Sequence, residues 1–215
     1  CIRDSNITFY GITGASKGLT IDGGFQLSTN DATGLSSLSV TGASTLAANV
    51  TTSGTQSYSG TTTLSAGDRT LEGSTVTLAA VTGGSNALTV TGNLDLDGAI
   101  SGVTDLSVSG TSNIGANVTT SGTQSYTGTT TVSASSTLNG TGVNAAAIVL
   151  NDNLNITSSG SSSVSGVISG TGNLTKAGSG TLTLSGTNIY SGSTNINSGR
   201  LTVSGTLNDN TIVSV

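Results

Sequence analysis

The densest group of charged side chains is Asp68, Arg69 and Glu72, where acid–base chemistry would first be sought. Enzymes that cleave polysaccharides cluster Asp or Glu with Lys, Arg or His, to move protons at sugar carbons and oxygens. This chain has no His, five Lys and Arg residues in total, and Glu72 as its single glutamate. Because the group also lies beside a glycine corner, we expect a solvated turn, no catalytic residue and no enzyme.

A second pair of carboxylates, Asp95 and Asp97, precedes Gly98 and could bind calcium from one face of a strand. A calcium site needs six to eight oxygen ligands, and neither a glycine-rich nonapeptide repeat nor an EF-hand loop surrounds this pair. We expect a solvated strand edge, and we predict no metal site.

The segment Thr13–Gly18, TGASKG, is similar to the glycine-rich nucleotide loop of short-chain dehydrogenases. That loop places the N-terminus of a helix against a pyrophosphate. Here Thr20 replaces the last glycine, and Leu19–Ile21 has the pattern of a strand. We therefore predict a structural turn and no cofactor.

Rows of threonine and three tyrosines are the remaining candidates for recognition. Thr61–Thr63 and Thr129–Thr131 resemble the threonine arrays of ice-binding proteins, but those arrays repeat in every coil and these do not. Tyr58, Tyr126 and Tyr190 could be exposed and stack on sugars, or could cap the core at a corner, which we favour.

The elements that would position these residues belong to a long internal repeat. Ala48–Ala66 recurs at an offset of 68 as Ala116–Ala134, with two differences in nineteen positions. Ser5–Ile21 aligns with Ser74–Val90 at an offset of 69. Residues up to about 140 are therefore two copies of one unit, and a repeat of this kind predicts a solenoid or an array.

Composition narrows the class of protein further. Ser and Thr number 76 of 215 residues and Gly 32, while charged residues are 7% and Pro is absent. The net charge of −5 argues against nucleic acid, which requires basic patches. No run of about 18 apolar residues is present that could span a membrane as a helix.

Short runs of alternating apolar and hydroxyl residues predict an all-β fold. The same strand pattern returns after 18–23 residues at Leu19, Leu38, Leu88, Leu106, Leu182 and Leu201. This spacing predicts a right-handed parallel β-helix of roughly ten coils, with three coils in each 68-residue unit. The absence of Pro fits, because interior strands must donate N–H groups to their neighbours.

The C-terminal part carries the most specific pattern. Gly170–Lys176, Gly180–Gly186, Asn188–Thr194 and Gly199–Leu201 closely resemble the passenger-associated repeat of bacterial autotransporters. The 68-residue units resemble, more loosely, the repeats of filamentous-haemagglutinin-like adhesins. Both resemblances imply a β-helical passenger that an outer-membrane β-barrel translocator exports by type V secretion to the cell surface or the medium.

We predict three regions: residues 1–140 as β-helix from the two units, 141–165 as irregular coils or a linker, and 166–215 as the passenger repeat, continuing beyond the C-terminus. The resemblance implies adhesion to a host cell surface, matrix or glycan, or a rigid stalk for an adhesin. A self-assembling filament or surface layer made of copies of the chain is the alternative.

Two further features leave alternatives open. Cys1 is the single cysteine and is either a lipidated N-terminus or the start of a fragment. Asn-x-Thr sequons recur along the chain, among them those at Asn6, Asn49, Asn117, Asn155 and Asn173, and in a bacterial setting we expect them to be by-products of strands rich in Asn and Thr.

Overall fold

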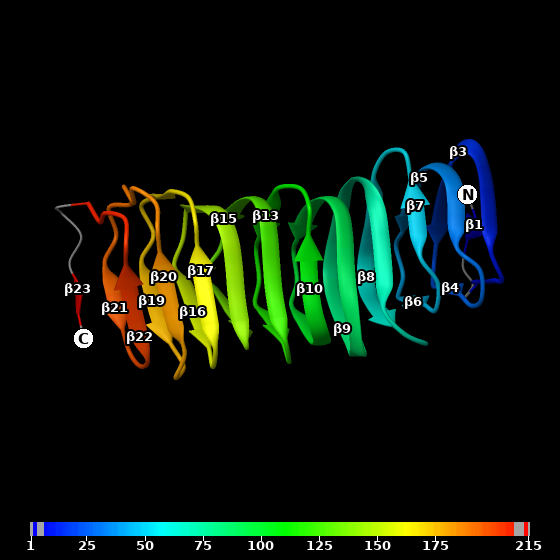
Figure 1. Ribbon diagram of the computed structural model, residues 1–215. Helices are drawn as coiled ribbons and strands as arrows, with labels where there is room; N and C mark the ends of the chain where they lie inside the picture. The colour runs from blue at the N-terminus through cyan, green and yellow to red at the C-terminus, as the bar shows by residue number, and fades with distance from the viewer. Residues whose placement is uncertain (1, 4–6, 209–212, 215) are drawn as a thin grey trace.

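The computed structural model describes residues 2–3, 7–208 and 213–214, and every regular element in them is a β-strand (Figure 1). The strands are β1 (Ile2–Arg3), β2 (Ile7–Phe9), β3 (Ile12–Asp22), β4 (Phe25–Leu27), β5 (Ala32–Val40), β6 (Ser44–Leu46), β7 (Val50–Thr52), β8 (Gln56–Leu64), β9 (Arg69–Leu96), β10 (Ile100–Val108), β11 (Ser112–Ile114), β12 (Val118–Thr120), β13 (Thr123–Val132), β14 (Ser136–Gly140), β15 (Gly142–Leu150), β16 (Leu154–Ser158), β17 (Ser161–Val164), β18 (Ile168–Gly170), β19 (Leu174–Ala177), β20 (Thr181–Leu184), β21 (Thr194–Ile196), β22 (Arg200–Val203) and β23 (Val213–Ser214).

The strands stack in parallel along one axis, so the chain forms a β-solenoid of about 10 turns (Figure 1). This confirms the predicted all-β coil architecture. Each coil has three faces. The face that we call face B is traced by residues paired directly in register: Ile7, Phe25, Ser44, Thr62, Val81, Ile100, Val118, Leu138, Ile156, Lys176 and Ile196.

A narrow apolar core runs the length of the solenoid because alternate residues of each strand point inward. In β6 the burial runs buried, half-buried, buried, with Leu46 fully inside, and β8 ends in the same way at Leu64. Leu46 and Leu64 lie side by side in neighbouring coils. Stacks of such aliphatic side chains fill the interior without large aromatic clusters.

Polar side chains at the corners tie each coil to the next. The Oδ1 atom of Asn49 accepts a hydrogen bond from the amide of Thr70 at 2.9 Å, and that of Asn117 accepts one from Thr137 at 2.7 Å. Asp31 and Asp105 accept the amides of Asn49 and Thr123 in the same way. These bonds satisfy backbone donors where the strand ladder is interrupted.

Two of the sequon asparagines, Asn49 and Asn117, therefore have a structural role as acceptors at corners. Asn173 acts likewise, because its Oδ1 accepts the amide of Ser193 at 2.7 Å. Asn155 lies in β16, and Asn6 lies outside the described residues, as does Cys1.

The expected length of three coils for the 68-residue unit is wrong. Three turns from Thr62 along face B reach Val118, twelve residues before Thr130, the repeat copy of Thr62. Thr130 pairs instead with Ser112 and Ile148, on another face that we call face A. Because one repeat unit makes three coils and two further faces, the two copies of each side chain point in different directions around the axis.

The ladder continues through the region predicted to be irregular. β15 pairs with β13, β16 with β14, and β17 with β15. The division of the chain at residues 140 and 165 remains a prediction.

Five buried hydroxyl oxygens have no hydrogen-bond partner within the described part of the chain: those of Ser44, Thr62, Ser112, Thr130 and Ser158. Ser44 lies against Thr62, so two unpaired hydroxyls meet inside face B. A buried hydroxyl without a partner costs about 1–3 kcal/mol. We expect Thr62→Val, which keeps the shape, to raise the free energy of unfolding by about 1 kcal/mol in urea denaturation.

The control is Thr61→Val at the exposed neighbouring position, which should change stability by less than about 0.5 kcal/mol. Destabilisation by Thr62→Val would contradict this interpretation and indicate that the hydroxyl is hydrogen bonded, for example to an internal water.

Candidate functional site

The charged group around Arg69 does not assemble into a catalytic cluster. Arg69 turns back on its own corner and donates hydrogen bonds to the carbonyl oxygens of Gly67 at 3.1 Å and Ala66 at 2.8 Å. The carboxylate of Asp68 accepts the amide of Ala87, and that of Glu72 accepts the Thr51 hydroxyl at 3.4 Å. The three side chains therefore bind separate partners.

Asp95 and Asp97 do not share a strand face, contrary to the sequence pattern. β9 ends at Leu96, so Asp97 lies beyond the end of the strand and is exposed. Asp95 accepts a hydrogen bond from the side-chain amide of Asn113 at 2.8 Å. Across residues 2–3, 7–208 and 213–214, no three His, Cys, Asp or Glu side chains lie close enough together to hold a metal ion.

The tyrosines capping the corners are buried. Tyr58 and Tyr126 each donate their hydroxyl to a buried glutamine, Gln56 at 2.9 Å and Gln124 at 3.0 Å. Burial raises the pKa of both phenols far above its usual range. Tyr190 is also buried, with its hydroxyl against that of Thr194. These rings are core residues and do not offer faces to sugars.

The threonine rows are divided between inside and outside. Thr62 and Thr130 point into the core, whereas Thr61 and Thr129 are exposed. Since the two rows also lie on different faces, they do not form the continuous flat array that ice binding requires.

The segment Thr13–Gly18, predicted to be a structural turn, lies within β3, bends at Ala15 and Ser16 and shapes a groove. β3 runs through it to Asp22 without a helix, and Ala15 and Ser16 have φ values of 40° and 59°. A positive φ is uncommon for residues other than glycine. At the repeat copy, Gly84 and Ser85 have φ values of 58° and 63°, so both units make the same left-handed corner.

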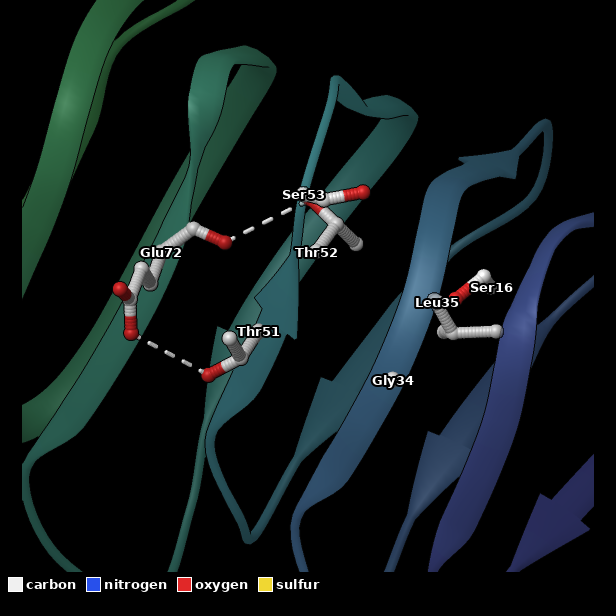
Figure 2. A pocket seen from close by; sticks show the side chains of 7 residues that line it. All are labelled: Ser16, Gly34, Leu35, Thr51, Thr52, Ser53 and Glu72. Carbon is white, nitrogen blue, oxygen red and sulfur yellow. Dashed lines mark hydrogen bonds between the residues drawn. The ribbon is translucent and has the colours of Figure 1, made fainter.

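The first groove, which we call groove 1, lies beside the corner at Ser16 and crosses several coils (Figure 2). Its cavity volume is about 310 Å³. It is lined by Ser16, Gly34, Leu35, Thr51, Thr52, Ser53 and Glu72, which come from β3, β5, the end of β7 and β9.

The second groove, which we call groove 2, has a volume of about 220 Å³ and is built from repeat copies of the same residues. Its lining is Ser85, Gly102, Val103, Thr119, Thr120 and Ser121. Each of these residues follows its counterpart in groove 1 by 68 or 69 positions, and Val103 in place of Leu35 is the one change of residue type.

Both hollows form because the coil following the corner carries a glycine of positive φ, Gly34 at 68° and Gly102 at 65°. The ladder register shifts at the same places, between Thr13 and Lys17 and between Ser101 and Val103. The same uncommon backbone conformation thus occurs at the Ser16 corner and at the Ser85 corner. Backbone strain of this kind is often found at functional sites, which is a reason to examine both grooves.

The grooves differ at one wall. In groove 1, the backbone oxygen of Glu72 accepts a hydrogen bond from Thr52 at 3.4 Å (Figure 2). The same oxygen accepts one from the side-chain amide of Gln56 at 2.7 Å. The equivalent bonds in groove 2 go to the oxygen of Asn139, from Gln124 at 2.8 Å and Thr120 at 3.5 Å. An amide thus replaces the carboxylate beside groove 2.

The sequence indicated neither groove, because each is assembled from residues about one coil apart. The signal that could have found them is the set of hydroxyl and glycine positions that recur at an offset of 68 or 69.

Comparison with known proteins gives a family match at the C-terminal end of the rod. Residues 174–203 match the family model of the passenger-associated-transport-repeat. Searches of curated proteins and of solved structures return no match. The matched passenger-associated repeat spans β19 to β22 and stacks directly on the preceding coils, since β19 pairs with β16 and β20 with β17. The repeat and the solenoid fit an autotransporter passenger. Among the described residues, no helix is long and apolar enough to cross a membrane.

Lys176 of the passenger-associated repeat is buried on face B between Ile156 and Ile196. Its ammonium group donates to the carbonyl oxygens of Ala177 at 2.5 Å, Gly178 at 2.9 Å and Ser198 at 3.4 Å. Desolvation lowers the pKa of this amine below its usual value of 10.5.

This burial predicts a pH dependence of stability. Between the lowered pKa of the folded state and the value of 10.5 in the unfolded state, the unfolded chain binds more protons. The contribution of Lys176 to stability is therefore smallest at low pH and rises as the pH increases through that window. The measurement is the urea midpoint against pH for the wild type and for Lys176→Met. The midpoint of the wild type minus that of the variant should rise with pH through that window. The absence of this rise would show that the amine is not buried.

Proposed function

We propose that this chain is part of a bacterial surface or secreted passenger, which acts in adhesion or as the rigid stalk of an adhesin. The observation that carries the proposal is the passenger-associated repeat at residues 174–203, in register with the strand ladder of the rest of the rod. In this function an outer-membrane β-barrel translocator exports the chain, and the rod extends from the cell surface.

The separation of the charged side chains supports a structural role over a catalytic one. Asp68, Arg69 and Glu72 bind separate partners and leave no acid–base pair beside either groove that could cleave a glycosidic bond.

The placement of the repeat copies supports contact on several sides of the rod. Thr62 and Thr130 belong to different faces, so equivalent surfaces point in different directions. Individually weak contacts around a rod can add to strong attachment where a cell surface offers many ligands.

The test is adhesion of beads coated with the chain to host cells and to surfaces coated with matrix proteins, with uncoated beads as the control. Attachment to cells or matrix supports an adhesive rod. Attachment to neither supports the stalk. Clumping among coated beads alone would contradict both and favour the self-assembling filament.

A further inference from the structure

We propose that groove 1 and groove 2 are equivalent binding sites for an uncharged saccharide, an inference that rests on the proposed adhesive function and names its ligand class. The two grooves share their lining, their left-handed corner and their glycine.

The serine hydroxyls that the two grooves share are free to bind a polyhydroxylated ligand. The side-chain hydroxyls of Ser16 and Ser53 in groove 1 make no hydrogen bond within the described part of the chain, and neither do those of Ser85 and Ser121 in groove 2. Ser16 belongs to β3 and Ser53 follows the end of β7, and β5, which carries Leu35, pairs with both of these strands (Figure 2). A hydroxyl both donates and accepts hydrogen bonds, as a sugar hydroxyl does.

One apolar side chain lines the bottom of each groove, Leu35 in groove 1 and Val103 in groove 2. Both are almost fully buried, at 4% and 1% exposed, so a ligand would contact only the edge of either side chain. A pyranose ring offers C–H groups on its faces and hydroxyls at its rim, which matches an apolar floor with polar walls. The volume of groove 1, about 310 Å³, is at the lower end of the range of small-molecule sites, about 300–1,000 Å³, and that of groove 2, about 220 Å³, lies below this range.

Charge argues against anionic and cationic ligands for a site that both grooves share. The lining contains no Lys or Arg to bind sulfate, phosphate or sialic acid carboxylates. A cationic ligand would find the carboxylate of Glu72 beside groove 1 but the neutral amide of Asn139 at the equivalent place beside groove 2. The common ligand is therefore neutral.

The grooves point to different sides of the rod. Ser85 is the repeat copy of Ser16, so the rotation that separates Thr62 from Thr130 also separates these two corners. Ser16 stands just before Lys17, which pairs with Leu35, and Ser85 follows Val81 on face B. With a rise of about 4.8 Å per coil, three coils and two faces separate the grooves by about 18 Å along the axis. Saccharide chains can thus approach from two directions at once.

The experiment measures binding of neutral hexose and N-acetylhexosamine oligomers to the whole chain by isothermal titration calorimetry. Sulfated and sialylated oligomers are the anionic probes, and chitosan oligomers are the cationic probe. The variants Ser53→Trp and Ser121→Trp each fill one groove from an exposed corner position. Ser159→Trp is the matched control, because Ser159 is an exposed corner residue of the same kind outside both grooves.

We expect the wild type and Ser159→Trp each to bind two neutral oligomers per chain. Ser53→Trp and Ser121→Trp should each bind one. The double variant Ser53→Trp/Ser121→Trp should bind at least tenfold more weakly than the wild type. Circular dichroism and thermal denaturation confirm that the variants fold. The proposal is overturned if no neutral oligomer binds, if only charged oligomers bind, or if the double variant binds as the wild type does.

Bead adhesion with the same variants separates this proposal from the function it rests on. Beads that attach to cells equally well with and without the double substitution would overturn the grooves as sites and leave adhesion standing. Neutral oligomers that bind the grooves of a chain whose beads attach to nothing would support the grooves and contradict adhesion.

Discussion

Replacing Tyr126 by Ala should lower the free energy of unfolding by about 3–5 kcal/mol, the cost of removing a large buried aromatic side chain. Tyr126 is 1% exposed and its hydroxyl donates to the buried Oε1 of Gln124. The substitution leaves a cavity and an unpaired acceptor together. Because each coil touches only its neighbours, amide hydrogen exchange should accelerate first in β13, β10 and β15.

Two further variants separate the causes. Tyr126→Phe keeps the ring and removes the hydroxyl, so it should cost about 1–2 kcal/mol. Thr129→Ala, at an exposed position of the same strand, should change stability by less than about 0.5 kcal/mol. If Tyr126→Ala is no more costly than Thr129→Ala, the ring does not support the core.

The second large effect is expected for Gly98→Ala, at the corner between β9 and β10. A Cβ atom at Gly98 would lie 1.5 Å from the backbone oxygen of Ala79 in the preceding coil. Backbone cannot move aside as a side chain does, so the two coils must separate. We expect a loss of about 3 kcal/mol in urea denaturation, at the upper end for overpacking.

Gly18→Ala is the control for this prediction. A Cβ atom there would meet the hydroxyl oxygen of Ser37 at 2.7 Å, and that side chain can rotate away. The loss should stay below about 1 kcal/mol, the usual cost of a tolerated small change in packing. Equal losses for the two glycine variants would show that the close approach of Gly98 to the Ala79 oxygen does not set the cost.

The fold class and the repeat family were predictable because they depend on local patterns. Alternating apolar and hydroxyl residues fix which side of a strand is buried, and recurrence at Leu19 and Leu38 fixes the coil length. The passenger-associated repeat was recognisable from Gly170–Lys176 and Gly180–Gly186 for the same reason, since its pattern lies within one stretch of chain.

Burial of the tyrosines could be argued from sequence, but their partners could not. Gln56 and Tyr58 are two residues apart on a strand, which places both on one face. Only the stacked coils determine that this face is interior and that the glutamine amide reaches the carbonyl oxygen of Glu72.

The sequence by itself therefore determined the all-β class, the alternation of inward and outward residues and the kind of repeat. The tertiary structure alone decided which way each copy points, because one repeat unit is not a whole number of coils and the excess rotates Thr130 away from Thr62. It also decided the grooves, because Ser16, Gly34 and Thr51 meet only when consecutive coils stack.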